Sequence, residues 1–318
     1  MTRTTRLAAC AASLVMFLLS LSIGAGEFSL SRLIEDPESL HFLVASRLPR
    51  TLAALFTGAA LSIAGLILQA MVRNRFVEPS TAGTSQSAAL GILLMTLFFP
   101  AAPIAVKMLA ASILALVGTS LFLMSAHRLP PTQPYLMPLF GIVYGGVIGA
   151  TVTYIGWQTE LLQFIEIWTN GEFSGVMRGR YELLWGTVGA VAIAWWTADR
   201  LTVLSLGRDV SIGLGLNYQR TLQLALVIVS VVSALTVVVV GIIPFVGLVV
   251  PNIVSRLMGD NLRGTIPWVA LCGGLLVLGC DILGRLLRYP YEIPVSTVMG
   301  VVGALLFLRL MFGRPTYA

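Results

Sequence analysis

Few ionisable residues in this chain are placed to do chemistry, and one absence among them excludes a class of enzyme. The single lysine, Lys107, follows Ala105 and Val106 in an apolar stretch. A loop that cradles the phosphates of ATP needs Gly-Lys-Ser/Thr in a glycine-rich turn, and the chain has no such sequence. The chain therefore cannot itself be a P-loop ATPase. If ATP drives it, the ATPase is another polypeptide.

Neither the histidines nor the cysteines have the spacing of a metal site. His41 and His127 lie far apart in polar segments, and no His-Glu-x-x-His motif occurs. We interpret them as solvated loop residues, with haem or iron ligation as the alternative. Cys10, Cys272 and Cys280 lie in apolar runs without metal-ligand or disulfide spacing and are interpreted as buried small residues. We expect no catalytic residue, no metal and no cofactor bound by this chain.

The composition places the chain in a membrane. Of its 318 residues, 57% are hydrophobic and 11% are charged, with a mean hydropathy of +0.91. A soluble domain has about 25% charged residues, so we predict an all-α polytopic membrane protein. The formal net charge of +6 is attributed to basic loops beside anionic lipid. Nucleic-acid binding is not expected, because no basic patch alternates with exposed aromatic residues.

The apolar runs predict about ten transmembrane helices in one domain, residues 1–318. The run from Thr221 to Met258 would be about 57 Å long as one helix, nearly twice the hydrocarbon core, so we place a break at Gly241 and Pro244. The first run resembles a signal peptide but is interpreted as a retained span. The expected spans are Leu7–Ile23, the run from Arg47 to Val72, and 86–100, 103–125, 135–156, 183–198, 221–240, 242–258, 265–283 and 295–312.

Local patterns predict where the backbone approaches other elements. Small residues let membrane helices pack closely. In the span after Arg47 they are Gly58, Ala59, Ala60, Ser62, Ala64 and Gly65. Pro79–Gly83 and Pro294–Gly300 are predicted to form irregular backbone beside a cavity. Leu161–Trp168 are predicted to form an interfacial helix.

The distribution of charges predicts the orientation and leaves a rival function open. With both termini inside, arginines are more frequent on the inner side, as is usual in membrane proteins. Secondary transporters place ionisable groups near the bilayer midplane, whereas here nearly all charges flank the spans. Asp281 and Arg285 are four residues apart, which also fits a local ion pair. An ion-coupled transporter is the main alternative, and a structural or receptor protein is a third class.

Several motifs together resemble one transporter family. They are Arg47-Leu-Pro-Arg-Thr51, Gly58-Ala-Ala-Leu61, Gly65, Gln69-Ala70, Asn74, Glu78-Pro79, Leu206–Leu216, Gly247-Leu-Val-Val-Pro251 and the stretch from Asp281 to Pro294. The chain resembles the membrane permease of ABC importers for iron(III)-siderophores, haem and vitamin B12. The resemblance implies a type II ABC importer permease fold over nearly the whole chain. One departure is Asn252, where relatives often carry His.

The resemblance also implies three groups of site residues. For docking of the substrate-binding protein they are Arg47, Arg50 and Arg285, with Arg288 a weaker match and headgroup anchoring the alternative. For coupling to the ATPase they are Leu206, Gly207, Arg208, Asp209, Ser211, Gly213, Leu214 and Gly215, with Gly213 and Gly215 expected to permit a sharp turn. For the translocation path or gate they are Asn74, Phe76, Val77, Thr132 and Gln133.

The implied assembly contains several partners. They are a second permease chain, identical or homologous, two ATP-binding cassette ATPase subunits that bind ATP and Mg, and a periplasmic or lipid-anchored binding protein. The Trp168–Tyr181 stretch looks most like permeases for catecholate-type siderophores, so an iron-siderophore is preferred to haem or vitamin B12. The expected location is the prokaryotic cell (inner) membrane, with both termini cytoplasmic.

Overall fold

Helices account for most of the described chain. The computed structural model describes residues 3–23, 41, 43–126 and 136–312. Thr132 and Gln133 of the predicted gate lie outside these ranges. The described residues form no β-strand, and their one β pairing is an isolated bridge between Asn170 and Ile242. The all-α prediction is therefore confirmed for the residues that the structure describes.

Each predicted apolar run overlaps a helix. The predicted break is confirmed, because one helix ends at Val240 and the next begins at Val246. The main helices are α1 (Arg3–Ser22), α3 (Leu48–Val72), α4 (Thr84–Phe98), α5 (Ile104–Ala126), α6 (Leu136–Gln158), α7 (Leu162–Thr169), α8 (Trp185–Trp196), α9 (Ala198–Ser205), α10 (Arg208–Gly213), α11 (Tyr218–Val240), α12 (Val246–Met258), α13 (Leu262–Leu286) and α14 (Val295–Phe312). Three short turns of other helix types are η1 (Leu43–Arg47), η2 (Pro79–Ala82) and η3 (Glu182–Leu184).

The described helices fall into two length classes. Six segments are long and apolar enough to cross a membrane: Leu43–Val72, Ile104–Ser125, Leu139–Gln158, Tyr218–Val240, Leu262–Leu286 and Val295–Phe312. Shorter apolar helices occupy Leu7–Ser22, Thr84–Phe98, Glu182–Trp196 and Val246–Met258. A bilayer core about 30 Å thick needs about 20 helical residues. The count of about ten spans therefore stays a prediction.

Helix α3 lies at the centre of the bundle and packs against α13, α11 and α12. Its glycines permit this packing. A β-carbon on Gly58 would lie 2.2 Å from the carbonyl oxygen of Gly273, and one on Gly65 would lie 2.0 Å from that of Gly247. The prediction that small residues of this span allow close backbone approach is confirmed.

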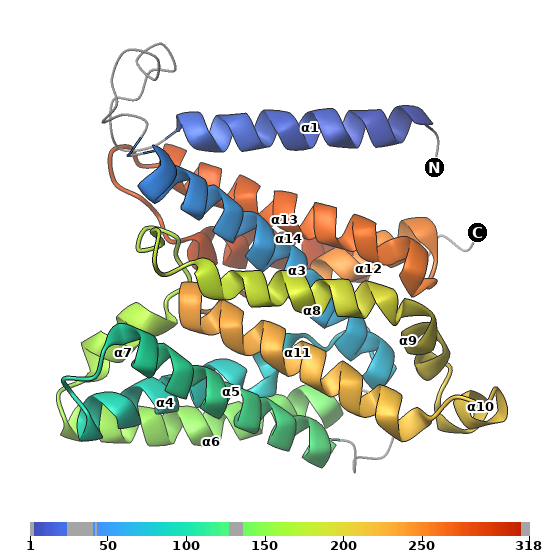
Figure 1. The fold of residues 1–318 in the computed structure, drawn as a ribbon, viewed down its shortest axis with the longest axis horizontal. Coiled ribbons are helices and arrows are strands. Elements are labelled where there is room, and N and C mark those ends of the chain that lie inside the picture. The colour runs from blue at the N-terminus through green and yellow to red at the C-terminus, as the bar shows by residue number, and fades with distance from the viewer. Residues whose placement is uncertain (1–2, 24–40, 42, 127–135, 313–318) are drawn as a thin grey trace.

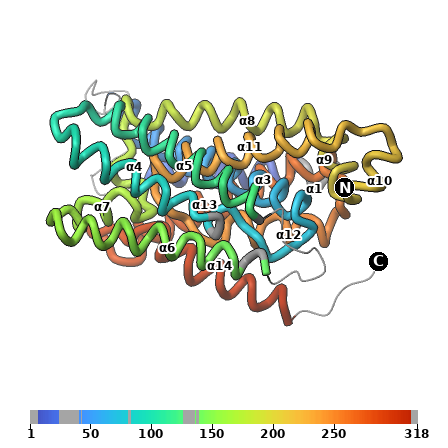
Figure 2. The backbone as a smooth tube through the Cα atoms, turned by 90° about the horizontal axis from the view of Figure 1, so that it is seen from below, coloured from blue at the N-terminus to red at the C-terminus, as the bar shows by residue number. Residues whose placement is uncertain are grey.

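The bundle has two ends that carry different features. Figures 1 and 2 place α10 at one end, where α1 begins and α14 ends. The opposite end carries α7 and the start of α3 (Figure 1). We call these the α10 end and the α7 end. Within the described residues, α1 begins and α14 ends at the α10 end, and the side of the membrane that this end faces stays a prediction.

Two local predictions need correction. Cys280 is buried as expected, but Cys10 and Cys272 are exposed because they lie on outward faces of α1 and α13. Residues 295–300 are helical rather than irregular, since α14 begins at Val295. The helix predicted at Leu161–Trp168 is present as α7, and its location at the membrane interface stays a prediction.

Candidate functional site

Three predicted docking arginines lie together at the α7 end, in a cluster with two carboxylates. We define the arginine cluster as Arg47, Arg50, Asp281, Arg285 and Glu292. Arg50 Nη2 lies 2.7 Å from Asp281 Oδ1, and Arg50 Nη1 lies 2.8 Å from Glu292 Oε2. Arg285 Nη2 lies 2.7 Å from Asp281 Oδ2. The local ion pair considered from the sequence spacing is therefore present.

Two of these arginines hold the end of α1. Arg285 donates to the carbonyl oxygens of Ser20 (2.9 Å) and Ile23 (2.6 Å) and to Ser20 Oγ (2.8 Å). Arg47 Nη1 donates to the carbonyl oxygens of Leu21 (2.7 Å) and Ser22 (3.2 Å). A cation at a helix C-terminus satisfies orphan carbonyls and interacts favourably with the helix dipole. Sequence reasoning missed this role.

Burial separates the predicted docking residues. Arg47 and Arg285 are 6% and 4% exposed, so their guanidinium groups face the interior of this structure. The Arg50 side chain is 15% exposed. Arg288, the weaker match in sequence, is exposed and its guanidinium carbon lies 5.7 Å from the centre of the Tyr291 ring. Docking at the α7 end stays a prediction, and Arg50 and Arg288 are its more accessible candidates.

The predicted coupling segment forms a knob at the α10 end (Figure 1). We define the knob as Leu206–Gly215, which contains α10. Ser211 Oγ lies within hydrogen-bond distance of the carbonyl oxygens of Val203 (2.8 Å) and Gly207 (2.6 Å), so its one O–H ties α10 to the preceding segment. Its apolar side chains are at least half exposed, at Leu206, Val210, Ile212 and Leu214. The knob therefore presents an apolar surface that fits a partner protein.

The glycines of the knob differ from the sequence expectation. Gly207 and Gly215 have φ of 101° and 80°, so they make the turns that bulkier residues resist. Gly213 is the last residue of α10, and it is not among the positive-φ glycines of the described chain. The expectation that Gly213 makes a sharp turn is wrong. Leu214, next to it, ends the helix instead.

The predicted gate residues begin where α3 ends. Asn74 is buried, and its Oδ1 accepts a hydrogen bond from the backbone N–H of Phe76 at 2.9 Å. Val77 is fully buried, whereas Phe76 is exposed and meets Phe307 of α14 edge to face at a centroid distance of 6.2 Å. Phe76 is therefore the exposed member of the three described gate candidates, and their role in the translocation path stays a prediction. Phe307 carried no signal in the sequence.

Behind the gate residues, a buried carboxylate meets the start of α12. Glu78 accepts hydrogen bonds from Ser80 Oγ at 2.5 Å and from the backbone N–H groups of Phe245 and Leu248. Burial raises the pKa of the Glu78 carboxyl, and these three hydrogen bonds oppose the shift. The position at a helix N-terminus also favours the negative charge.

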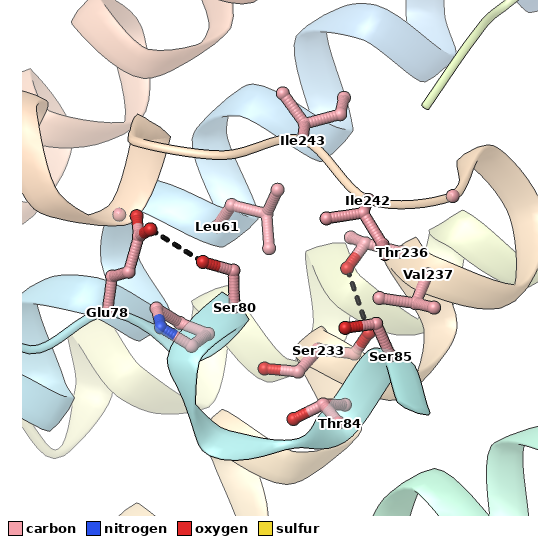
Figure 3. A pocket seen from close by; sticks show the side chains of 13 residues that line it. Leu61, Glu78, Ser80, Thr84, Ser85, Ser233, Thr236, Val237, Ile242 and Ile243 are labelled. Atoms are coloured by element: carbon pink, nitrogen blue, oxygen red, sulfur yellow. Dashed lines mark hydrogen bonds between the residues drawn. The ribbon is translucent and has the colours of Figure 1, made fainter. Parts of the chain in front are cut away.

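A small cavity of about 20 Å³ lies beside this turn and is lined by Leu61 in the middle of α3 (Figure 3). Hydroxyl groups surround it, from Ser80, Thr84, Ser85, Ser233 and Thr236. The prediction of irregular backbone beside a cavity is confirmed for Pro79–Gly83. Interrupted helices of this kind are tolerated in membranes where they line a cavity.

A larger open pocket of about 870 Å³ lies on the other side of the α11–α12 break. Gln163, Glu166, Asn170, Glu172 and Ser296 supply polar groups to its wall. Three backbone segments are joined here by hydrogen bonds: Ile242 N to Thr169 O (3.0 Å), Glu172 N to Val240 O (3.0 Å) and Ser296 N to Gly171 O (2.9 Å). We call this space the outer pocket, after the side of the membrane that the sequence predicts for this end of the bundle. Ile242 lines both it and the small cavity.

Comparison with known proteins decides the family. The model of the FecCD transport family matches residues 12–313. The chain belongs to the FecCD transport family. It is 39% identical to the petrobactin import system permease protein YclN of Bacillus subtilis (strain 168), over 96% of this chain and 97% of that protein. It is also 39% identical to the petrobactin import system permease protein FatD of Bacillus anthracis, over 88% of this chain and 83% of that protein.

Solved structures agree with the sequence comparison. An inward-facing conformation of a metal-chelate type ABC transporter superposes with a TM-score of 0.84 and 26% identity, covering 98% of this chain and 99% of that one. The FecCD chain is therefore a transport permease of the ABC importer type rather than an enzyme, and it has a type II importer permease fold. Its helices and family make it a multi-pass membrane protein.

Proposed function

We propose that this FecCD permease receives an iron(III)-siderophore from a substrate-binding protein and releases it into the cytoplasm. The observation that carries the proposal is the 39% identity to two petrobactin import permeases, which extends over 96% of this chain for one of them. The proposed substrate is a siderophore of catecholate type. The outer pocket is the space through which it would pass.

The proposed mechanism is alternating access driven by ATP in a partner. The exposed knob would dock on an ATP-binding cassette subunit, which binds ATP and Mg, and one such subunit would serve each permease chain. Arg73 at the end of α3 supports this route, because its Nη1 would lie 3.0 Å from a β-carbon on Gly207. A movement of the knob would therefore reach the central helix directly. The chain itself binds no nucleotide in this proposal.

The proposed assembly has two permease chains, and the proposed orientation places the α10 end in the cytoplasm. Residues 1–318 form a single membrane domain in this account. Thr132 and Gln133 remain proposed gate residues alongside Asn74, Phe76 and Val77. Arg47, Arg50 and Arg285, with Arg288 as the weaker match, remain the proposed docking residues for the binding protein.

A substrate panel tests the proposal. A bacterial strain without its own siderophore permeases would express this chain with its ATPase and binding protein, and uptake of radioactive iron and of radiolabelled vitamin B12 would be measured. We expect uptake with ferric petrobactin or another catecholate siderophore. Uptake of haem or vitamin B12 alone would replace the substrate assignment with the alternative from the same family. Uptake that depends on a proton gradient and does not depend on ATP would support the secondary-transporter alternative.

A further inference from the structure

Arg50 is shared between two carboxylates that differ in accessibility. Its Nε and Nη2 donate to Asp281 Oδ1 at 3.3 and 2.7 Å. The Asp281 side chain is 3% exposed. Its Nη1 donates to Glu292 Oε1 and Oε2 at 3.0 and 2.8 Å, and the Glu292 side chain is 28% exposed. Asp281 also forms an ion pair with Arg285. Asp281 is therefore the fixed partner of Arg50, and Glu292 is the replaceable one.

We propose that Glu292 is an internal stand-in for a carboxylate of the substrate-binding protein. In the free permease it occupies the outer edge of Arg50, and it is displaced when the binding protein docks. The proposal rests on the proposed function, because it takes docking to occur at the α7 end.

The charges of the arginine cluster favour displacement over simple addition. Arg47 and Arg285 are buried and donate to the C-terminus of α1, so Arg50 presents the accessible guanidinium edge of the cluster. Nη1 at that edge already contacts both oxygens of Glu292. A second carboxylate there would face Glu292 at short range, and like charges in contact are unfavourable. An incoming carboxylate therefore competes with Glu292.

Displacement of Glu292 would act on the connection between α13 and α14. This connection is tied to α13 by the hydrogen bond from Ile293 N to Gly284 O at 3.0 Å. Ser296, four residues after Glu292, donates its N–H to Gly171 O at 2.9 Å and lines the outer pocket. Docking would thus loosen a segment that leads into the wall of the outer pocket. Arrival of the binding protein is thereby linked to the place where its cargo enters.

Affinity for the binding protein tests the stand-in. The complete transporter would be held in lipid nanodiscs, and its affinity for its own substrate-binding protein would be measured at low and high salt. Glu292→Gln keeps the shape of the side chain and removes its charge. We expect about two- to fivefold tighter binding at low salt, the range of an exposed ion pair, with a smaller gain at high salt. Glu292→Ala should change the affinity in the same direction.

Two further variants separate this effect from general electrostatics. Glu160→Gln removes one negative charge in the turn between α6 and α7, also at the α7 end, and should leave the affinity unchanged. In an Arg50→Gln background, Glu292→Gln should have no effect, because the edge for which it competes is gone. The thermal unfolding midpoint of each variant would confirm that the bundle is intact.

The outcomes distinguish the stand-in from docking itself. Unchanged or weaker binding in Glu292→Gln, together with weaker binding in Arg50→Gln, would overturn the stand-in and leave docking at Arg50 in place. Unchanged affinity of the Arg50→Gln variant for the binding protein would overturn docking at Arg50. The stand-in role of Glu292 would be overturned with it, because that role requires docking at Arg50. Equal tightening by Glu160→Gln would assign the effect to total charge and overturn the stand-in.

Discussion

The guanidinium group of Arg73 occupies the space that a side chain at Gly207 would need. A β-carbon at residue 207 would lie 3.0 Å from Arg73 Nη1, and Gly207 has a φ of 101°. Arg73 is the C-cap of the central helix α3, and Gly207 is the N-cap of α10 in the knob. A side chain at residue 207 would therefore meet the C-cap residue of the central helix at the α10 end.

Substitution of Gly207 should uncouple transport. Gly207→Val places a β-branched residue at positive φ, and this backbone strain costs about 1–3 kcal/mol in the knob. The new side chain would also displace the end of the Arg73 side chain. We expect iron uptake to fall strongly while the chain still inserts in the membrane. The matched control is Gly264→Ala in α13, where a β-carbon meets nothing within 4 Å. Uptake by Gly207→Val equal to that of the parent would contradict the coupling route.

Substitution of Gly65 should destabilise the bundle. A β-carbon there would lie 2.0 Å from the carbonyl oxygen of Gly247, which is backbone and cannot rotate away. We expect Gly65→Ala to lose about 1–3 kcal/mol, the usual range for overpacking. The thermal unfolding midpoint in detergent measures this. Gly146→Ala on α6 is the control, because a β-carbon there meets nothing within 4 Å. A similar midpoint for both variants would argue against close α3–α12 packing.

Glu78 should make stability depend on pH. Burial raises its folded-state pKa above the ordinary value of 4.5. Well below pH 4.5 the Glu78 carboxyl is protonated in both the folded and the unfolded state, so its burial does not lower the free energy of unfolding. As pH rises from there through the folded pKa, unfolding releases a proton, so stability falls and then stays lower. We expect Glu78→Gln to remove this decline. Parallel pH curves of unfolding midpoint for parent and variant would refute the prediction.

Loss of Arg285 should release α1. Arg285→Leu removes the hydrogen bonds to Ser20 and Ile23 and one of the two cations on Asp281. Breaking a buried pair costs about 3–5 kcal/mol, so the unfolding midpoint should fall by many degrees. Arg288→Leu changes an exposed arginine three residues later and should stay within about 0.5 kcal/mol of the parent. Equal effects of the two substitutions would mean that Arg285 does not fasten α1.

The sequence predicted those parts of the fold that depend on local pattern. Apolar runs predicted where helices lie, the length of the run from Thr221 to Met258 predicted the break before α12, and small residues predicted the close packing of α3. The roles of Arg47 and Arg285 could not be predicted, because their partners are carbonyl groups at the end of α1, more than twenty residues away. The pairing of Glu292 with Arg50 could not be predicted either, because the two residues lie far apart in the sequence.

Gly213 shows why motif resemblance does not predict backbone conformation. Gly213 and Gly215 look alike in sequence, yet among these two only Gly215 has positive φ in the structure. Which glycine makes the turn depends on where α10 ends, and helix ends are poorly specified by local sequence. Phe307 was missed for a related reason, because its contact with Phe76 joins segments far apart in the chain.

The central claim is tested most directly by iron uptake into proteoliposomes that contain the permease, its ATPase subunits and its binding protein. Radioactive ferric petrobactin would be supplied together with the binding protein on one face, and ATP with Mg on the face that carries the ATPase. The account predicts accumulation that requires ATP, the binding protein and an intact Gly207. Accumulation without ATP, or ATP-dependent transport that excludes every ferric siderophore, would contradict it.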